Sequence, residues 1–184
     1  MYDQKEKLWQ DLKNVFYNVV PYFVDFATSI GIGLLVALVL GVPFAFFRDV
    51  PMDIVHFVFG LFGMCVALYR CCFRRGYHAN SCTYSFSLKK AAQYTGICFA
   101  VQTLLIMLIG AHALYVTGPT YWITETLFPS AVRSVMGDHF WYEGYDWLLM
   151  FLADGLLYGP IMLYGEYVGS KERKKDYSLE TQER

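Results

Sequence analysis

Charged residues are nearly missing from four long stretches of this 184-residue sequence. Residues 26–47, 54–69 and 91–120 contain no Asp, Glu, Lys or Arg, and residues 148–168 contain only Asp154 and Glu166. A core helix of a soluble protein would show polar residues along one face, and these stretches do not. A transmembrane helix needs ~20 mostly apolar residues. The scarcity of charge therefore predicts an all-α, polytopic membrane protein.

Basic residues are scarce in two of the gaps between these stretches. Of the fifteen Lys and Arg residues, only Arg48 and Arg133 lie in the gaps that follow the first and third stretches. Basic side chains are retained on the cytoplasmic side during insertion. We therefore predict four transmembrane helices, at about 24–47, 52–70, 91–115 and 148–168, in the cell membrane with both the N- and C-termini cytoplasmic. A merged or re-entrant pair of spans is the competing interpretation.

The remaining segments are expected to flank one membrane-embedded helical bundle that comprises residues 1–184. Leu8, Leu12 and Phe16 share one helical face, which predicts an N-terminal interfacial amphipathic helix that Pro21 ends or kinks. The outer segment 117–147 is rich in aromatic residues and is expected at the bilayer interface. The cytoplasmic tail 169–184 is polar and is predicted to be partly disordered.

Familiar catalytic signatures are missing as well. The sequence has no phosphate-binding glycine loop, no His-Glu-x-x-His, no Gly-x-Ser-x-Gly and no pair of Asp residues in the spans of the kind that intramembrane aspartyl proteases use. No cysteine lies in the outer gaps, which argues against an enzyme that makes disulfides outside the cell. We expect reduced thiols on the cytoplasmic side or in the inner half of a span, no cofactor and no metal. The cysteines concerned are Cys65, Cys71, Cys72, Cys82 and Cys98.

One cytoplasmic stretch, residues 74–82, brings an imidazole and a thiol close together in the sequence. His78 and Cys82 could form a nucleophile–base pair. The run from His78 to Ser81 resembles the His-Ala-x-Ser portion of membrane peptidases that process peptide pheromones, and the resemblance implies a membrane cysteine peptidase. That family places its cysteine about seven residues after the histidine, where this sequence has Ser85. A metal site in the same region would lack a paired Cys-x-x-Cys pattern.

Small residues recur at every fourth position of the first predicted span and continue from Asp25. We call this set the small-residue stripe: Ser29, Gly33, Ala37, Gly41 and Ala45. Such spacing lets another helix approach closely. Two interpretations stay open, packing within the four-helix bundle and a seam for self-association. Gly155 and Gly159 repeat the spacing in the fourth span.

Asp154 is the most costly residue of the predicted spans, because a carboxylate inside a bilayer costs roughly 2.5–3.5 kcal/mol. The polar residues Gln102, Thr103, His56 and His112 are its expected partners. Together they could line a transport route, or Asp154 could make a structural hydrogen bond between helices. Pro160 could kink the same helix. Asp25 and Glu166 are instead predicted near the cytoplasmic boundary, paired with nearby lysines.

Three hypotheses for function follow. The first is a non-enzymatic subunit or assembly module that packs against copies of itself or against another membrane protein. The second is a small oligomeric permease or ion channel that uses Asp154, Gln102, His56 and His112. The third is the cysteine peptidase that uses His78 and Cys82. The basic gaps favour the bilayer and its anionic lipids at the cytoplasmic face as partners, and do not favour nucleic acid.

Overall fold

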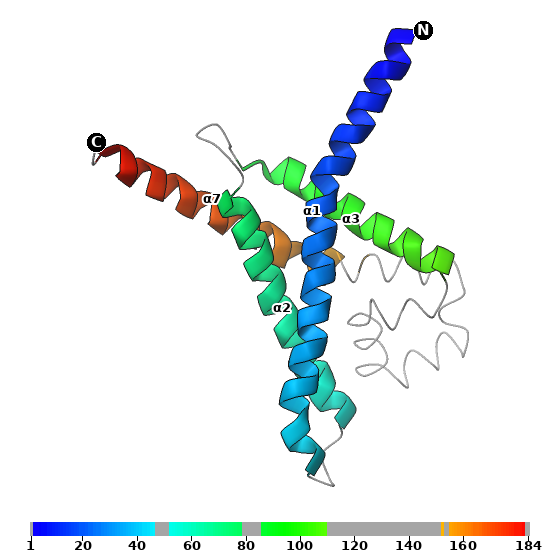
Figure 1. Ribbon diagram of the computed structural model, residues 1–184, viewed down its shortest axis with the longest axis vertical. Helices are drawn as coiled ribbons and strands as arrows, with labels where there is room; N and C mark the ends of the chain where they lie inside the picture. The colour runs from blue at the N-terminus through cyan, green and yellow to red at the C-terminus, as the bar shows by residue number, and fades with distance from the viewer. Residues whose placement is uncertain (1, 47–51, 79–85, 110–151, 153–154, 183–184) are drawn as a thin grey trace.

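The computed structural model of the chain describes residues 2–46, 52–78, 86–109, 152 and 155–182 (Figure 1). The regular structure in these residues is helical, with no strand among them, so the all-α prediction is confirmed. The elements are α1 (Tyr2–Gly41), the 3-10 helix η1 (Val42–Phe46), α2 (Met52–His78), α3 (Leu88–Ile109) and α7 (Gly159–Gln182).

Helices α1 and α2 form an antiparallel pair, against which α3 and α7 pack. Gly41 of α1 lies against His56 of α2, and Gly33 lies against Met64 further along. Since the partner's residue number rises as that of α1 falls, the two helices run in opposite directions. Small residues on α1 allow this close approach, as the four-residue spacing predicts.

Helix α7 packs on the C-terminal half of α2, and the two helices run in the same direction. Gly165 of α7 lies against Tyr69, and Gly169 lies against Phe73. Four residues along one helix therefore correspond to four residues along the other, which is the register of parallel packing. Figure 1 shows α7 crossing α2 near its C-terminal end.

Helix α3 completes the bundle through aromatic contacts. The ring of Tyr94 lies 5.9 Å from that of Tyr22, and the ring of Phe99 meets that of Phe26 edge-on at 5.5 Å. Both contacts advance along the chain together, so α3 runs in the same sense as α1, which it crosses at a steep angle in Figure 1. The ring of Phe86, just before α3, contacts Tyr167 of α7 at 5.6 Å.

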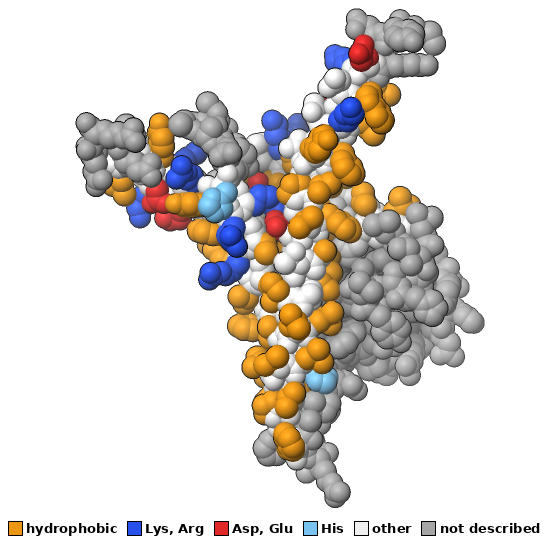
Figure 2. Space-filling model, in the orientation of Figure 1, with side chains coloured by type: hydrophobic (Ala, Val, Ile, Leu, Met, Phe, Trp, Pro, Cys, Tyr) orange, Lys and Arg blue, Asp and Glu red, His pale blue; other side chains and the backbone are white. Residues whose placement is uncertain are grey.

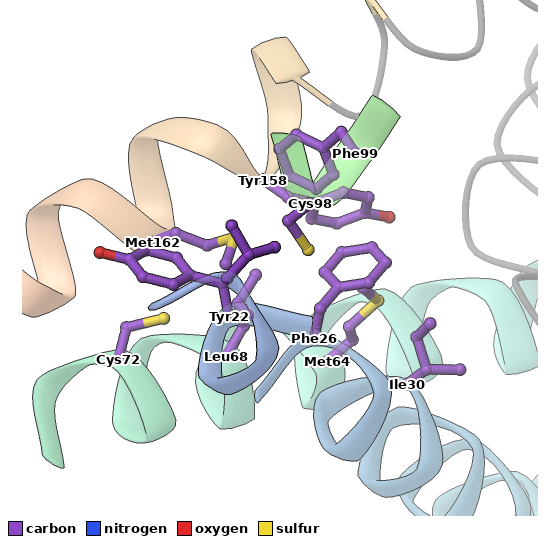
Figure 3. Close-up of a cluster of buried hydrophobic side chains, with 11 residues drawn as sticks. Tyr22, Phe26, Ile30, Met64, Leu68, Cys72, Cys98, Phe99, Tyr158 and Met162 are labelled. Atoms are coloured by element: carbon purple, nitrogen blue, oxygen red, sulfur yellow. The ribbon is translucent and has the colours of Figure 1, made fainter. Parts of the chain in front are cut away.

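The hydrophobic core lies where α1, α2, α3 and α7 meet (Figure 3). Phe26 is its centre, because its ring also contacts Tyr158 edge-on at 5.5 Å. Burial of such large side chains provides most of the packing energy that holds four helices together. The buried members are Val19, Tyr22, Phe26, Ile30, Met64, Leu68, Cys72, Cys98, Phe99, Tyr158 and Met162.

Helix α1 differs from the expectation of a separate interfacial helix followed by a span. It continues without a break through Pro21. Val19 and Tyr22, on either side of the proline, are both buried in the core. Their packing offsets the one backbone hydrogen bond that proline removes. Of the described residues, one helical segment, Glu6–Phe44, is long and apolar enough to cross a membrane.

The chain is also more helical than predicted near its C-terminus. Helix α7 extends to Gln182, so most of the tail predicted to be partly disordered is helical. The hydroxyl of Tyr77 donates a 2.7 Å hydrogen bond to Asp176, which ties this extension to α2. A turn at Tyr158, close to Pro160, separates helical residues 155–157 from α7. Proline removes a backbone donor there, as the predicted kink requires.

Candidate functional site

The small-residue stripe lies in the interface between α1 and α2. Ser29, Gly33, Ala37 and Gly41 are buried, and Ala45 lies in η1. A Cβ atom added at Gly33 would be 2.7 Å from the carbonyl oxygen of Gly60. The two backbones therefore touch at this point. Within the described residues the stripe packs against α2 of the same chain.

A second glycine interface, between α2 and α7, was not predicted. A Cβ atom at Gly76 would overlap the carbonyl oxygen of Glu166, and one at Gly169 would overlap that of Phe73. Gly165 and Gly169 have the same four-residue spacing as the stripe on α1. By contrast, a Cβ atom at Gly155 would meet nothing within 4 Å. Spacing alone therefore does not distinguish the packed glycines, Gly165 and Gly169, from Gly155.

Four polar side chains from three helices meet beside this interface, and we call them the Arg75 cluster: Tyr22, Asp25, Arg75 and Glu166. Nη1 of Arg75 donates to Oδ2 of Asp25, and Nη2 donates to Oε2 of Glu166 at 3.1 Å. The Tyr22 hydroxyl donates to the same Glu166 oxygen at 2.7 Å. The Arg75 guanidinium carbon also lies 3.6 Å from the centre of the Tyr22 ring.

The arrangement makes Arg75 the link between α1 and α7. Its side chain is 15% exposed and that of Glu166 is 4% exposed, so the pair lies largely out of water. Burial disfavours the charged guanidinium, but Cys72, Glu166, Tyr22 and Asp25 together hold the pKa of Arg75 above its usual value. A planar guanidinium suits this role, because it can reach two carboxylates and stack on a ring at once.

Cys72 lies at the edge of the cluster and is fully buried. Nη2 of Arg75 donates a weak 3.6 Å hydrogen bond to its sulfur. Burial raises the pKa of the Cys72 thiol to about 12, although the nearby Arg75 charge lowers it. Since the thiolate is the nucleophile, Cys72 is an inert core thiol at neutral pH. No disulfide joins the described cysteines Cys65, Cys71, Cys72 and Cys98.

The prediction that lysines pair with Asp25 and Glu166 is wrong, because both carboxylates bind Arg75. The sequence does hold one signal for this. Asp25 continues the small-residue stripe by one further four-residue step, so it faces α2 as the stripe does. Arg75, in contrast, is one of three arginines near the end of α2, and sequence spacing did not distinguish it from Arg70 and Arg74.

The polar residues proposed for a transport route are only partly described. Gln102 is buried in α3, and the hydroxyl of Thr103 donates to the carbonyl oxygen of Phe99 at 2.9 Å. His56 contacts Gly41 at the far end of the α1–α2 pair. Asp154 and His112 lie outside the described residues.

Of the two residues of the peptidase hypothesis, the structure describes only His78. His78 is the exposed last residue of α2, and its ring lies edge-on to Tyr77 at 5.3 Å. Cys82 lies outside the described residues, as does the outer aromatic segment 117–147. The described part of the chain contains no group of three or more His, Cys, Asp or Glu side chains that could hold a metal ion.

Comparison with known proteins does not identify a relative. A scan against protein-family models finds no match, and neither a search of curated proteins nor a search of solved structures finds one. Function is therefore argued from the chemistry and placement of the side chains.

Proposed function

We propose that this chain is a multi-pass integral membrane protein with four spans and cytoplasmic termini. One observation carries the proposal, the exposed stripe of α2. Side chains at every fourth position along this helix are exposed, first Val58, Phe62 and Val66, then Arg70, Arg74 and His78. A stripe that changes from apolar to basic within one turn is typical of a helix that leaves the hydrocarbon core for the headgroup region.

Helix α7 shows the same change at the same level. Tyr164 and Tyr167 are exposed large side chains, and Lys171, exposed as well, is the next residue on that face. The level can be compared because Gly165 of α7 lies against Tyr69 of α2, the residue before Arg70. Two helices that become basic at one level support a common boundary. Tyrosine is a residue that favours such boundaries.

The directions of packing fit alternating spans. Helices α1 and α3 advance in the same sense, although they cross steeply, and so do α2 and α7, whereas α1 and α2 are antiparallel. A chain that crosses a bilayer four times has this alternation. The exposed basic residues Lys89 and Lys90 open α3 at the end of the bundle where the Arg75 cluster lies, since the neighbouring Phe86 contacts Tyr167. Positive residues thus gather at one end, which we assign to the cytoplasm.

Within the membrane we propose a non-enzymatic role, as a subunit or assembly module. The ion pairs of the Arg75 cluster join three helices and so serve the fold. The outer face of α1 carries large exposed aliphatic side chains, namely Leu34, Leu35, Leu38 and Val39. Such a face can contact lipid or the helices of a partner without loss, because lipid tails are as apolar as leucine.

Two measurements test this proposal. Integral proteins stay in the membrane pellet after alkaline carbonate treatment, and release of this chain into the supernatant would contradict the membrane assignment. Native mass spectrometry of the gently solubilised protein then gives the mass of the complex. We expect a homo-oligomer or a defined foreign partner, whereas a bare monomer would contradict the subunit role.

Gln102 favours a second candidate function, a small oligomeric permease or ion channel. Gln102 lies in α3 and is 4% exposed. A buried amide in a span is commonly part of a polar path or of an interhelical hydrogen bond. Replacing Asp154 by Asn should abolish flux in vesicles while assembly is retained, and unchanged flux would exclude this function.

A further inference from the structure

The three arginines near the end of α2 differ in whether they form an ion pair. Arg75 is bound by two carboxylates, whereas Arg70 and Arg74 are exposed and make no ion pair within the described residues. Because Arg75 and Tyr22 engage Asp25 and Glu166, these carboxylates do not neutralise the two exposed arginines.

Arg70 and Arg74 both lie away from the faces of α2 that meet α1 and α7. Arg75 points toward α1, since it contacts Asp25. Arg70 and Arg74 precede it by five residues and one residue, which turns them roughly 140° and 100° round the helix in the same sense. Gly76, which lies against α7, is turned about 100° in the opposite sense. Figure 2 shows basic side chains at the end of α2, and acidic side chains among the basic ones nearer the α7 extension.

We infer that this basic surface, made of Arg70 and Arg74, binds the phosphate groups of anionic phospholipids in the cytoplasmic leaflet. The inference rests on the proposed membrane location. It adds a definite set of side chains and a definite class of partner, and it distinguishes this face from other basic positions of the chain.

The surroundings of the surface favour a lipid over a soluble anion. The cations continue directly from the apolar stripe of α2, so a headgroup bound there would have its acyl chains against Phe62 and Val66. Tyr69 and Tyr164, whose rings lie 6.2 Å apart, sit at the level where the two regions meet. Exposed cations beside an apolar face attract acidic headgroups. Arginine in addition forms paired hydrogen bonds with phosphate.

The test is lipid retention by the full chain. The protein is reconstituted in vesicles of equal phosphatidylglycerol and phosphatidylcholine, extracted gently, and examined by native mass spectrometry for bound lipid. We expect the wild-type chain to retain phosphatidylglycerol selectively. The double variant Arg70→Gln/Arg74→Gln should lose selectivity by roughly fivefold for each cation removed.

The control is Lys89→Gln/Lys90→Gln, which removes the same charge from the start of α3. If the control loses as much selectivity as the α2 variant, only overall charge matters and the inference is overturned. It is also overturned if the α2 variant retains wild-type selectivity. Carbonate extraction of each variant shows separately whether the protein is integral, so a failure of the membrane assignment is not confused with a failure of this surface.

Discussion

The two helix interfaces that meet on α2 are built from the same residue and differ in what surrounds it. Between α1 and α2, small residues spaced along four turns bring two apolar faces together. Between α2 and α7, glycines are concentrated at one end and are accompanied by the Arg75 cluster. The first interface can be formed wherever small residues recur. The second also requires a particular arginine to meet two particular carboxylates, so it fixes which helices pair and in which register.

The largest expected effect comes from removing the cation of the second interface. Replacing Arg75 by Gln leaves Asp25 and Glu166 near each other without a counter-charge. Loss of one partner from a buried ion pair typically costs about 3–5 kcal/mol. We expect a comparable fall in the free energy of unfolding, measured by titration of the solubilised protein with a denaturing detergent.

Two further variants sharpen this prediction. Lys90→Gln removes an exposed cation from α3 and should change stability by less than about 0.5 kcal/mol. Adding Asp25→Asn and Glu166→Gln to Arg75→Gln removes the uncompensated charges and should restore most of the loss. If the triple variant is as unstable as the single one, the Arg75 side chain acts through packing and not through charge.

The next effect compares the glycines of the two interfaces. A Cβ atom at Gly169 would overlap the backbone of Phe73, and one at Gly33 would come within 2.7 Å of the carbonyl oxygen of Gly60. Backbone cannot move aside as a flexible side chain can, so each Gly→Ala change should destabilise by about 1–3 kcal/mol. We expect the larger loss for Gly169→Ala, seen as a lower thermal midpoint in size-exclusion assays.

Gly31→Ala is the matched control, because a Cβ atom there would meet nothing within 4 Å. Alanine is the better helix former, so this variant should be neutral or more stable by up to ~1 kcal/mol. Equal losses at Gly31 and Gly33 would mean that the close approach of α1 and α2 does not limit stability.

The first interface was predictable from sequence and the second was not. Periodic small residues identify the α1 face, because a repeat of four positions keeps them on one side of a helix. Gly165 and Gly169, which pack against α2, have the same spacing as Gly155 and Gly159, so spacing could not show which pair is packed. The Arg75 cluster joins positions up to 144 residues apart in the sequence, and no local pattern specifies such a contact.

Local sequence patterns also failed to predict how far α1 and α7 extend. The sequence predicted that Pro21 ends or kinks the helix and that the tail is partly disordered, because proline and charge are unfavourable in isolated helices. Burial of Val19 and Tyr22 on either side of Pro21, and the Tyr77–Asp176 hydrogen bond, outweigh those local preferences. Tertiary contacts of this kind commonly override local preference.

A smaller effect is expected from the hydroxyl of Tyr22. Tyr22→Phe keeps the ring under the Arg75 guanidinium and removes only the hydrogen bond to Glu166. A hydrogen bond to a charged group contributes about 1.5–3 kcal/mol. Because Glu166 keeps its Arg75 partner, we expect a loss near the lower value in the same denaturation titration. Tyr17→Phe, at an exposed position of α1, should leave stability unchanged, and an equal loss there would remove the role assigned to the Glu166 hydrogen bond.

The last prediction concerns the reactivity of the Cys72 thiol, which measures whether the second interface is closed and leaves that interface unaltered. With Cys65, Cys82 and Cys98 replaced by Ser, the two remaining thiols, Cys71 and Cys72, are neighbours in sequence. Cys72 is fully buried and has a pKa raised to about 12 by burial, so about one molecule in 10⁴ is a thiolate at pH 8. Cys71 is only partly buried, although burial raises its pKa as well.

Maleimide should therefore modify Cys71 and leave Cys72 unmodified in the folded protein, as peptide mass spectrometry can show. Raising the pH increases the thiolate fraction and should speed the reaction of Cys71, whereas Cys72 should stay protected until the helices separate. The Arg75→Gln change should expose Cys72 to the reagent, because the side chain that holds α1, α2 and α7 together around this thiol is gone. If Cys72 reacts as fast as Cys71 in the unaltered interface, α7 does not cover α2 at this level, and the contrast between the two interfaces is lost.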